Sequence, residues 1–196
     1  KNLKFLCEEA DGISKHIDLF ETENVDTVVI NSVIQYFPSF EYLENVICNI
    51  SKVNTVKEII IGDVRNYDLL EAFHISVELH HLYQKKDQLS EEDLFLLTER
   101  VKIKVKEENE LLLSPQAFYA LKNKFPGIEN IEIIPRKSSH SNELVRFRYD
   151  VKISLNTDKD CFMDCSESDD VMNTLTYEDY KAEFGLLTNL NKFEHF

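Results

Sequence analysis

Polar side chains of several kinds follow two β-branched segments in the first third of the chain. They are Asn31, Ser32, Gln35, Tyr36, Asp63 and Arg65. The carboxyl ends of neighbouring parallel strands meet at one edge of an open sheet, and ligands bind at that edge. A carboxylate there can accept a proton or a hydrogen bond from an amine, and amide and hydroxyl groups can orient a ligand. These residues therefore indicate a candidate site.

Several of these residues also have a purely structural interpretation. Glutamine is a poor core residue, so Gln35 favours the site, whereas Tyr36 could instead pack against the helix that follows. Asp63 could accept a hydrogen bond from an amine, or it could cap the helix that begins near Asn66. Arg65 could orient a ligand or pair with Asp63.

His74 is a second kind of candidate, because a histidine titrates near neutral pH and can serve as a general base. It falls on a predicted helical stripe beside Leu70 and Val77, where a half-buried structural histidine is the commoner outcome. His80 and His81 do not stand four residues from His74, so they form no helical metal-binding pair with it. We expect no metal site.

Hydrophobic periodicity predicts the strands that hold these residues. Continuous β-branched runs at 25–31 and 58–64 are typical of strands that are covered on both faces, as in a parallel sheet. We expect a further short strand at 3–7 and two extended segments at 128–136 and 144–155. The last two are separated by a short polar turn, which favours an antiparallel hairpin at the edge of the sheet.

Helices are predicted between the strands. Ser39 caps one, a second runs from 66 to about 83, Ser90 opens a third with a capping box, and Ser114-Pro115 opens a fourth. Alternation of strands and helices indicates an α/β fold with a mostly parallel sheet and one late antiparallel strand.

Charge and composition limit the classes of partner. The chain has 22 basic and 36 acidic residues and a formal charge of −14, which disfavours binding to nucleic acid. Apolar runs are too short to span a membrane, and the first residues do not resemble a secretory signal. The cysteines, at positions 7, 48, 161 and 165, are expected to be reduced thiols in the cytoplasm.

Three separated blocks carry a resemblance to one family. They are DTVVINSVIQYFPS at 26–39, IGDVR at 61–65 with LLEAFH at 69–74, and NELVRFRYDV at 142–151. In this order they resemble the methyltransferase domains embedded in nonribosomal peptide synthetases. The resemblance implies a class I methyltransferase (Rossmann-like) sheet that uses S-adenosylmethionine. It makes residues 1–155 the carboxyl-terminal part of such a domain and 156–196 an acidic linker with a short docking helix.

The resemblance also implies roles for individual residues. The cofactor would contact Ala10, Asp11, Asn31, Ser32 and Val33; the reacting groups would meet Gln35, Tyr36, Asp63, His74 and Glu143; and the substrate would meet Arg65, Asn142 and Arg148. Glu143 could take the proton of an amine or position His74. The bases around Arg148 could meet a carrier protein or its phosphopantetheine, or could simply be solvated on the outer face of a strand.

Two features of the family pattern are absent. The chain has no Gly-x-Gly turn to wrap the methionine part of the cofactor, and it lacks the acidic residue that would hold the ribose. We therefore expect roughly 60–100 further residues upstream, with 3–7 as the third strand of the complete sheet. The missing amino-terminal part of the domain is thus an expected partner, and the fragment alone should bind cofactor poorly.

Three functions remain open at this point. The first is methyl transfer to the amino nitrogen of an aminoacyl or peptidyl group that is tethered to a carrier protein, with carbon or oxygen methylation as its close alternative. The second is a truncated, non-catalytic fragment that serves as a structural or docking module. The third is an acidic protein-interaction module, which would expose an apolar patch instead of a pocket.

Overall fold

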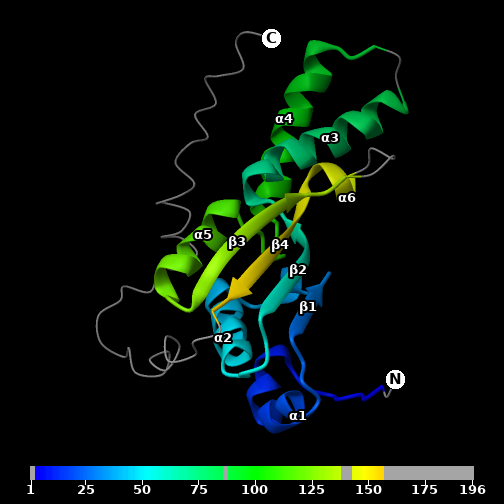
Figure 1. Ribbon diagram of the computed structural model, residues 1–196. Helices are drawn as coiled ribbons and strands as arrows, with labels where there is room; N and C mark the ends of the chain where they lie inside the picture. The colour runs from blue at the N-terminus through cyan, green and yellow to red at the C-terminus, as the bar shows by residue number, and fades with distance from the viewer. Residues whose placement is uncertain (1–2, 86–87, 138–142, 157–196) are drawn as a thin grey trace. The chain divides into compact units, whose positions relative to one another are not determined.

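The computed structural model describes residues 3–85, 88–137 and 143–156 (Figure 1). Its strands are β1 (Thr27–Asn31), β2 (Glu58–Arg65), β3 (Ile128–Pro135) and β4 (Arg148–Leu155). Its α-helices are α1 (Ile17–Thr22), α2 (Phe40–Ser51), α3 (Leu70–Tyr83), α4 (Glu91–Lys106), α5 (Pro115–Lys124) and α6 (Glu143–Arg146). Short 3-10 helices are η1 (Ala10–His16), η2 (Ile34–Tyr36) and η3 (Tyr67–Leu69).

The four described strands form one mixed sheet in the order β1-β2-β4-β3. β1 pairs with β2 in parallel, and β4 is antiparallel to both β2 and β3. It follows that β1, β2 and β3 run in one direction and only β4 runs against them. The predicted α/β sheet with one late antiparallel strand is therefore confirmed. The hairpin of β3 and β4 also forms as predicted, with β3 at the edge.

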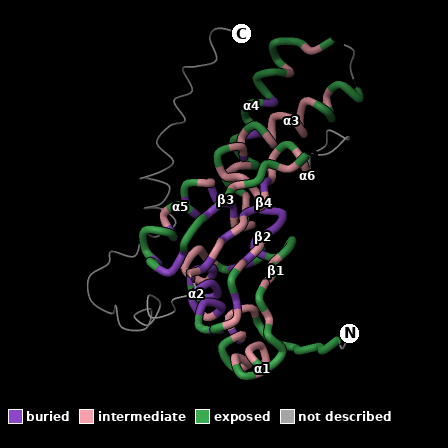
Figure 2. Tube along the Cα trace, viewed as in Figure 1, coloured by how far each residue is buried: buried purple, intermediate pink, exposed green. Residues whose placement is uncertain are grey.

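The core lies around β2 and α2, where the buried residues of Figure 2 concentrate. Ile59 and Ile61 of β2 are completely buried, because this strand has a neighbour on each side. Leu43 and Ile47 of α2 lie one turn apart on the helix face that packs against the sheet. The hydroxyl of Ser39 accepts a hydrogen bond from the Tyr42 amide and caps α2, as predicted.

Residues 3–7 do not form the predicted strand, and Phe5 among them is 86% exposed. A strand needs a neighbouring strand to pair its backbone groups. Within the described residues β1 pairs only with β2, so no strand lies along its other edge. The exposed Val29 of β1 marks the same open side.

The predicted strand at 144–155 begins late. Residues 143–146 form α6 instead, and β4 starts at Arg148, which pairs with Arg65. Because Arg65 is the last residue of β2, the segment before Arg148 has no strand beside it in that direction. The Phe147 carbonyl accepts a hydrogen bond from the Asn66 amide, which ties the start of β4 to the end of β2.

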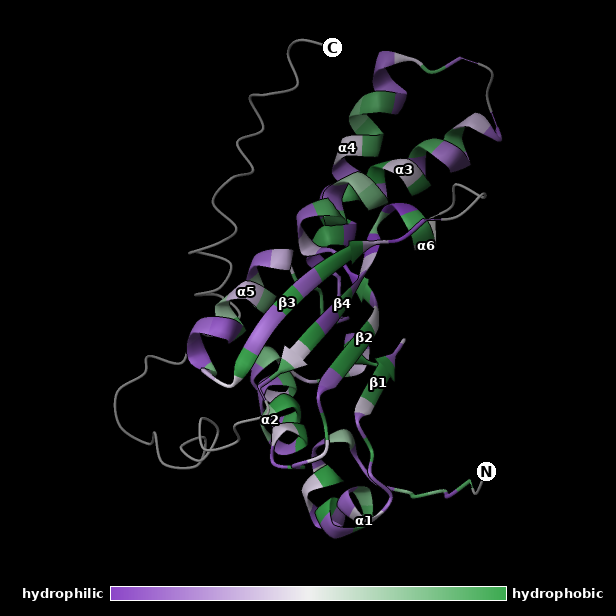
Figure 3. Cartoon of the chain, viewed as in Figure 1, coloured by the Kyte–Doolittle hydropathy of each residue, from purple (hydrophilic) through white to green (hydrophobic). Residues whose placement is uncertain are grey.

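The remaining helices follow the predictions closely. The expected helix at 66–83 is divided into η3 and α3, and the Ser90–Asp93 capping box forms at the start of α4. α3 and α4 pack against each other (Figure 1). Figure 3 shows apolar residues on α4, and Leu94, Phe95 and Leu96 are exposed there. None of the described helices has both the length and the apolar composition needed to cross a bilayer.

Several expectations fall outside the described residues. They concern Asn142, Cys161, Cys165 and, from residue 157 onward, the linker and docking helix predicted for 156–196. Of the two cysteines that the structure describes, Cys7 is exposed, Cys48 is buried, and both are free thiols.

Candidate functional site

The ends of β1 and β2 lie side by side, as the sequence predicted. Asn31 is in register with Gly62, and the Ser32 amide donates a hydrogen bond of 3.1 Å to the Gly62 carbonyl. The chain leaves β1 through the left-handed region at Ser32, with φ of 57°, and β2 has an irregularity in the same region at Asp63, with φ of 70°, before it continues to Arg65. Such backbone costs of order 1–3 kcal/mol for a residue other than glycine, and it concentrates at functional sites.

Gly62 allows the Asn31 side chain to lie across the sheet. A Cβ built at Gly62 would overlap the Asn31 amide oxygen. The other end of that amide donates to the Ser32 hydroxyl at 3.2 Å. A larger residue at position 62 would therefore have to displace the Asn31 side chain, and Asn31 and Ser32 present their polar groups together at the edge of the sheet.

Gln35 lies under this edge and is only 6% exposed. Its amide nitrogen donates to the Ser32 carbonyl at 3.1 Å, and its backbone carbonyl accepts from the Leu111 amide at 2.8 Å. Its side-chain oxygen Oε1 is buried without a hydrogen-bond partner in the part of the chain that the structure describes. Gln35 therefore holds the loop through two hydrogen bonds and retains one open acceptor. A buried acceptor without a partner costs folding free energy.

The neighbours of Gln35 point outward. Tyr36 is 72% exposed, so it does not pack against the following helix, and Val33 is exposed as well. Phe37 is buried instead and contacts the Tyr42 ring edge-on, with 4.8 Å between centroids. The loop therefore displays Tyr36 at the surface and uses Phe37 for packing.

Asp63 belongs to a charge-balanced cluster, which we call the Asp63 cluster: Asp63, Arg136, Arg148 and Asp150. The Asp63 carboxylate accepts from Arg148 at 2.5 Å and from Arg136 at 2.7 Å. Asp150 accepts from the Asp63 amide at 2.8 Å and from Arg136 at 3.1 Å. Asp63 therefore neither pairs with Arg65 nor caps the next helix, where Asn66 accepts from the Asp68 amide instead.

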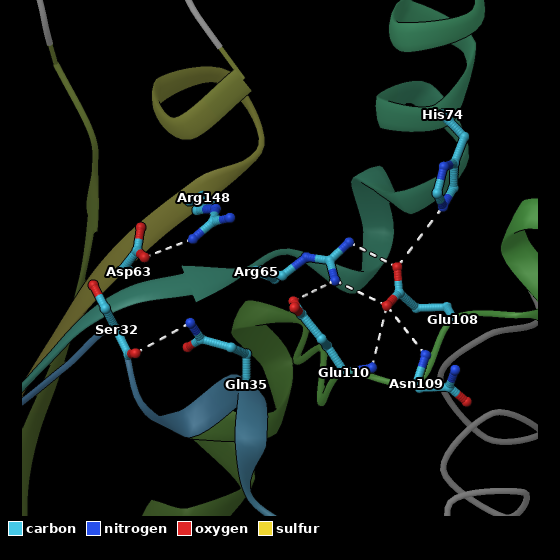
Figure 4. Close-up of polar contacts among 9 residues, drawn as sticks. All are labelled: Ser32, Gln35, Asp63, Arg65, His74, Glu108, Asn109, Glu110 and Arg148. Carbon is cyan, nitrogen blue, oxygen red and sulfur yellow. Dashed lines mark hydrogen bonds and ion pairs between the residues drawn. The ribbon is translucent and has the colours of Figure 1, made fainter.

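Arg65 belongs to a second cluster, which we call the Arg65 cluster: Arg65, His74, Glu108 and Glu110 (Figure 4). The guanidinium makes two bonds to Glu108, of 2.7 and 2.9 Å, and one of 2.6 Å to Glu110. Burial opposes the charge of Arg65, but the bonds to the two carboxylates outweigh it and raise its pKa. Burial likewise works against the Glu108 carboxylate, and the bond to Arg65 overcomes it and lowers the pKa of Glu108.

His74 stands behind Glu108. Its ring nitrogen Nε2 lies 3.8 Å from Glu108 Oε2, and it is buried without a hydrogen-bond partner among the described residues. Loss of solvation is the main reason that the pKa of His74 falls below its usual value, so the ring is neutral at pH 7. His74 therefore borders a carboxylate, and it does not line the pocket described next.

A pocket of about 290 Å³ opens beside the Arg65 cluster. It is lined by Arg65, Asn66, Leu70, Phe73, Glu110, Leu112, Phe147 and Arg148. The Phe73 and Phe147 rings meet edge-on, with 5.5 Å between centroids. The pocket thus lies between the end of β2, the start of α3 and the start of β4.

The other predicted site residues lie elsewhere or are only partly described. The Asp11 carboxylate accepts from the Tyr42 hydroxyl at 3.2 Å, and its backbone carbonyl accepts from the side-chain nitrogen of Asn49 at 3.0 Å, so η1, which begins with Ala10 and Asp11, packs against α2. The backbone of Glu143 begins α6, and its side chain lies outside the described residues. The roles predicted for Ala10, Asp11 and Glu143 stay predictions.

Sequence reasoning missed both acids of the Arg65 cluster, and it missed Arg136 and Asp150. Glu108 and Glu110 directly follow the capped helix and precede the apolar run that leads to Ser114-Pro115. Acids in a loop between two predicted helices were the available signal, although nothing in their spacing points to Arg65. In the part of the chain that the structure describes, no group of three or more His, Cys, Asp and Glu residues is arranged to hold a metal ion.

Comparison with known proteins adds a second line of evidence. The chain is 41% identical over 137 residues to a chondramide synthase of Chondromyces crocatus, a match that covers 69% of this chain and 3% of that protein. It is 36% identical over 141 residues to a cyclosporin synthetase of Tolypocladium inflatum, covering 70% of this chain and 1% of that protein. A beauvericin nonribosomal cyclodepsipeptide synthetase of Beauveria bassiana is 34% identical over 155 residues, covering 79% of this chain and 5% of that protein.

The matched segment is only 1–5% of the length of each of these relatives, so the chain spans a small part of them. No protein-family model matches it.

Proposed function

Since the chain is homologous to a short segment of nonribosomal peptide synthetases, we propose that it forms the carboxyl-terminal part of a methyltransferase domain that uses S-adenosylmethionine. In this proposal the domain transfers a methyl group to the amino nitrogen of an aminoacyl or peptidyl group tethered to a carrier protein. Methylation of carbon or oxygen by the same domain is the alternative, because each needs the same alignment of nucleophile and methyl group.

The edge formed by β1 and β2 carries the proposal. β1 ends at Asn31 in register with Gly62 of the parallel strand β2, the chain leaves β1 through left-handed backbone at Ser32, and Asn31 crosses over Gly62. Ligands of open α/β sheets bind at such carboxyl ends. Gln35 of the same loop has a buried side-chain oxygen with no hydrogen-bond partner among the described residues, which is the kind of open acceptor that a bound ligand can satisfy.

The residues present fit one part of the cofactor. Asn31 and Ser32 would hold it through their side chains and backbone, and the bound cofactor supplies a methyl group activated by positive sulfur. The Gly-x-Gly turn that would wrap its methionine part is not in this sequence. Among the strands that the structure describes, none pairs with β1 on the side away from β2, and an amino-terminal part of the domain would add strands there.

The chain's own contribution would be to bring a nucleophile within about 3–3.5 Å of the methyl group and in line with it. A carrier protein is the expected partner, as its acidic surface suits a basic patch. Arg136 and Arg148 already pair with Asp63, which reduces the charge available to such a partner at this strand.

Calorimetry with S-adenosylhomocysteine tests the proposal. It would be titrated into this chain and into the complete gene product. Binding by the longer protein and weak or no binding by this chain supports the proposal. Binding by neither contradicts it and favours a non-catalytic docking fragment, for which the missing glycine-rich turn is the specific argument.

A substitution at Gln35 separates two roles within the same site. Gln35→Ala in the complete protein removes the open acceptor beneath the loop, so turnover should fall more than affinity for S-adenosylhomocysteine. An equal loss of both would assign Gln35 to cofactor binding instead.

A further inference from the structure

The Arg65 cluster holds more negative charge than its own bases neutralise. Glu108 and Glu110 share the single guanidinium of Arg65, and His74 is neutral at pH 7 because burial lowers its pKa. Two carboxylates and one guanidinium leave one net negative charge. Glu108 is enclosed, with its side chain 12% exposed, whereas Glu110 is 37% exposed and lines the pocket.

Among the described residues that line the pocket, Arg148 is the other charged side chain besides Arg65 and Glu110. Arg148 lines the pocket, but its guanidinium is bound to Asp63 within a balanced cluster. Glu78 and Lys104 also act on His74 electrostatically, with opposite signs. Glu110 is thus the accessible carboxylate of a cluster with an uncompensated charge.

The lining of the pocket is half apolar and half polar, and its polar side consists of Arg65, Asn66, Glu110 and Arg148. Leu70, Phe73, Leu112 and Phe147 line it next to Glu110. The volume of about 290 Å³ lies at the small end of the range for ligand pockets. A carboxylate beside aromatic and aliphatic walls suits a compact ligand that has one cationic group and one apolar group, since each finds a complementary surface.

We propose that this pocket binds the amine end of the substrate, an aminoacyl group with an apolar side chain, and that Glu110 contacts its nitrogen. The inference rests on the proposed function and deepens it, because it assigns the amine to one pocket and one carboxylate. Leu70, Phe73 and Phe147 then contact the apolar side chain.

Besides binding the amine, Glu110 would stabilise the positive charge that develops on the nitrogen during methyl transfer. The bound ammonium first gives one proton to solvent; the lone pair of the neutral amine would then form the new N–C bond, the electrons of the breaking C–S bond would pass to sulfur, and the positive charge would move from sulfur to nitrogen. A carboxylate with no full counter-charge stabilises the charge that develops on nitrogen. Asp63 cannot serve this purpose equally well, because two guanidinium groups already neutralise it.

Direct binding measurements test the pocket without any cofactor. Leucine amide, which is mostly protonated at pH 6.5, and 4-methylpentanamide, which lacks the amine, would be titrated into this chain. Charge-assisted contact predicts that the chain binds leucine amide about tenfold or more tightly than the neutral amide. Equal binding of the two probes, or binding of neither, overturns the proposal.

Two variants locate the effect. Glu110→Gln keeps the shape of the side chain and should remove the preference for leucine amide, whereas Glu129→Gln makes the same change of charge on the exposed face of β3 and should preserve it. An unchanged preference in Glu110→Gln overturns the assignment. Cofactor binding is measured separately in the complete gene product. If the unsubstituted chain shows no preference for leucine amide while S-adenosylhomocysteine still binds, this inference alone is refuted, and the reverse result refutes the proposed function alone.

Discussion

Two ionic clusters stand at the end of β2, and they differ in charge balance. The Asp63 cluster has two aspartates and two arginines, and its members clamp the ends of β2, β3 and β4 together. The Arg65 cluster has two glutamates for one arginine and borders a pocket that is lined partly by apolar side chains. Asp63 and Arg65 belong to the same strand, but Asp63 lies in a cluster whose charges balance and Arg65 lies in a cluster with one excess negative charge.

The difference separates a structural role from a binding role. A buried group whose charge is fully matched gains nothing from a ligand, and removing it leaves its partners unpaired. A cluster with an excess charge tolerates loss of that charge and gains from a ligand of opposite sign. The stability of charge-changing variants can therefore distinguish the two clusters before any activity is measured.

Arg65→Met should have the largest effect. It leaves Glu108 and Glu110 without their shared partner, and breaking a buried pair in this way costs roughly 3–5 kcal/mol of unfolding free energy. Denaturant unfolding measures the loss. Arg100→Met is a matched control, since Arg100 is 57% exposed and 3.6 Å from Glu78, and it should change stability by less than about 1 kcal/mol.

Asp63→Asn and Glu110→Gln form the sharpest comparison, because each removes one negative charge and little volume. Asp63→Asn should cost about 1.5–3 kcal/mol, since it weakens hydrogen bonds to two guanidinium groups. Glu110→Gln should stay within about 0.5 kcal/mol, because Arg65 retains Glu108. Equal losses in the two unfolding curves would contradict the distinction between the clusters.

Gly62→Ala should cost about 1 kcal/mol, at the low end for an inserted methyl group, because the overlapping Asn31 side chain is exposed and can turn away. In the complete protein the displaced Asn31 should weaken binding of S-adenosylhomocysteine. Gly12→Ala is the control, as its new methyl group would meet the flexible end of Glu8. A normal affinity in Gly62→Ala would remove Asn31 from the site.

His74 should produce the smallest effect, seen in the pH dependence of stability. Its folded pKa lies below the usual value of 6.5, so the unfolded chain binds the proton more readily. His74 therefore lowers stability as the pH falls below about 6.5. Thermal unfolding at pH 7 and pH 5.5 should show a smaller difference in His74→Gln than in the parent chain. An identical difference would mean that His74 does not carry the effect.

Much of the fold could be predicted from local patterns. The β-branched runs identified β1 and β2, and the capping residues Ser39 and Ser90 identified the starts of α2 and α4. The expected strand at 3–7 does not form, since pairing depends on a neighbour that the pattern does not reveal.

The site was harder to predict than the fold. The edge at Asn31 and Asp63 followed from strand direction alone. The partners of Arg65 and Asp63 could not be predicted in this way, because Glu108 lies 43 positions from Arg65 and Arg148 lies 85 positions from Asp63. Such pairings depend on how loops and the late strand close over the sheet, and residue type and spacing carry little information about that closure.

A methyl-transfer assay on the complete gene product tests the account most directly. The protein would be incubated with S-adenosylmethionine and an aminoacyl group loaded on a carrier domain, and the released amino acid would be examined by mass spectrometry. We predict one added methyl group on the amino nitrogen, and a slower reaction in Glu110→Gln than in Glu129→Gln. No methyl transfer, or a methyl group on carbon or oxygen, would contradict the account.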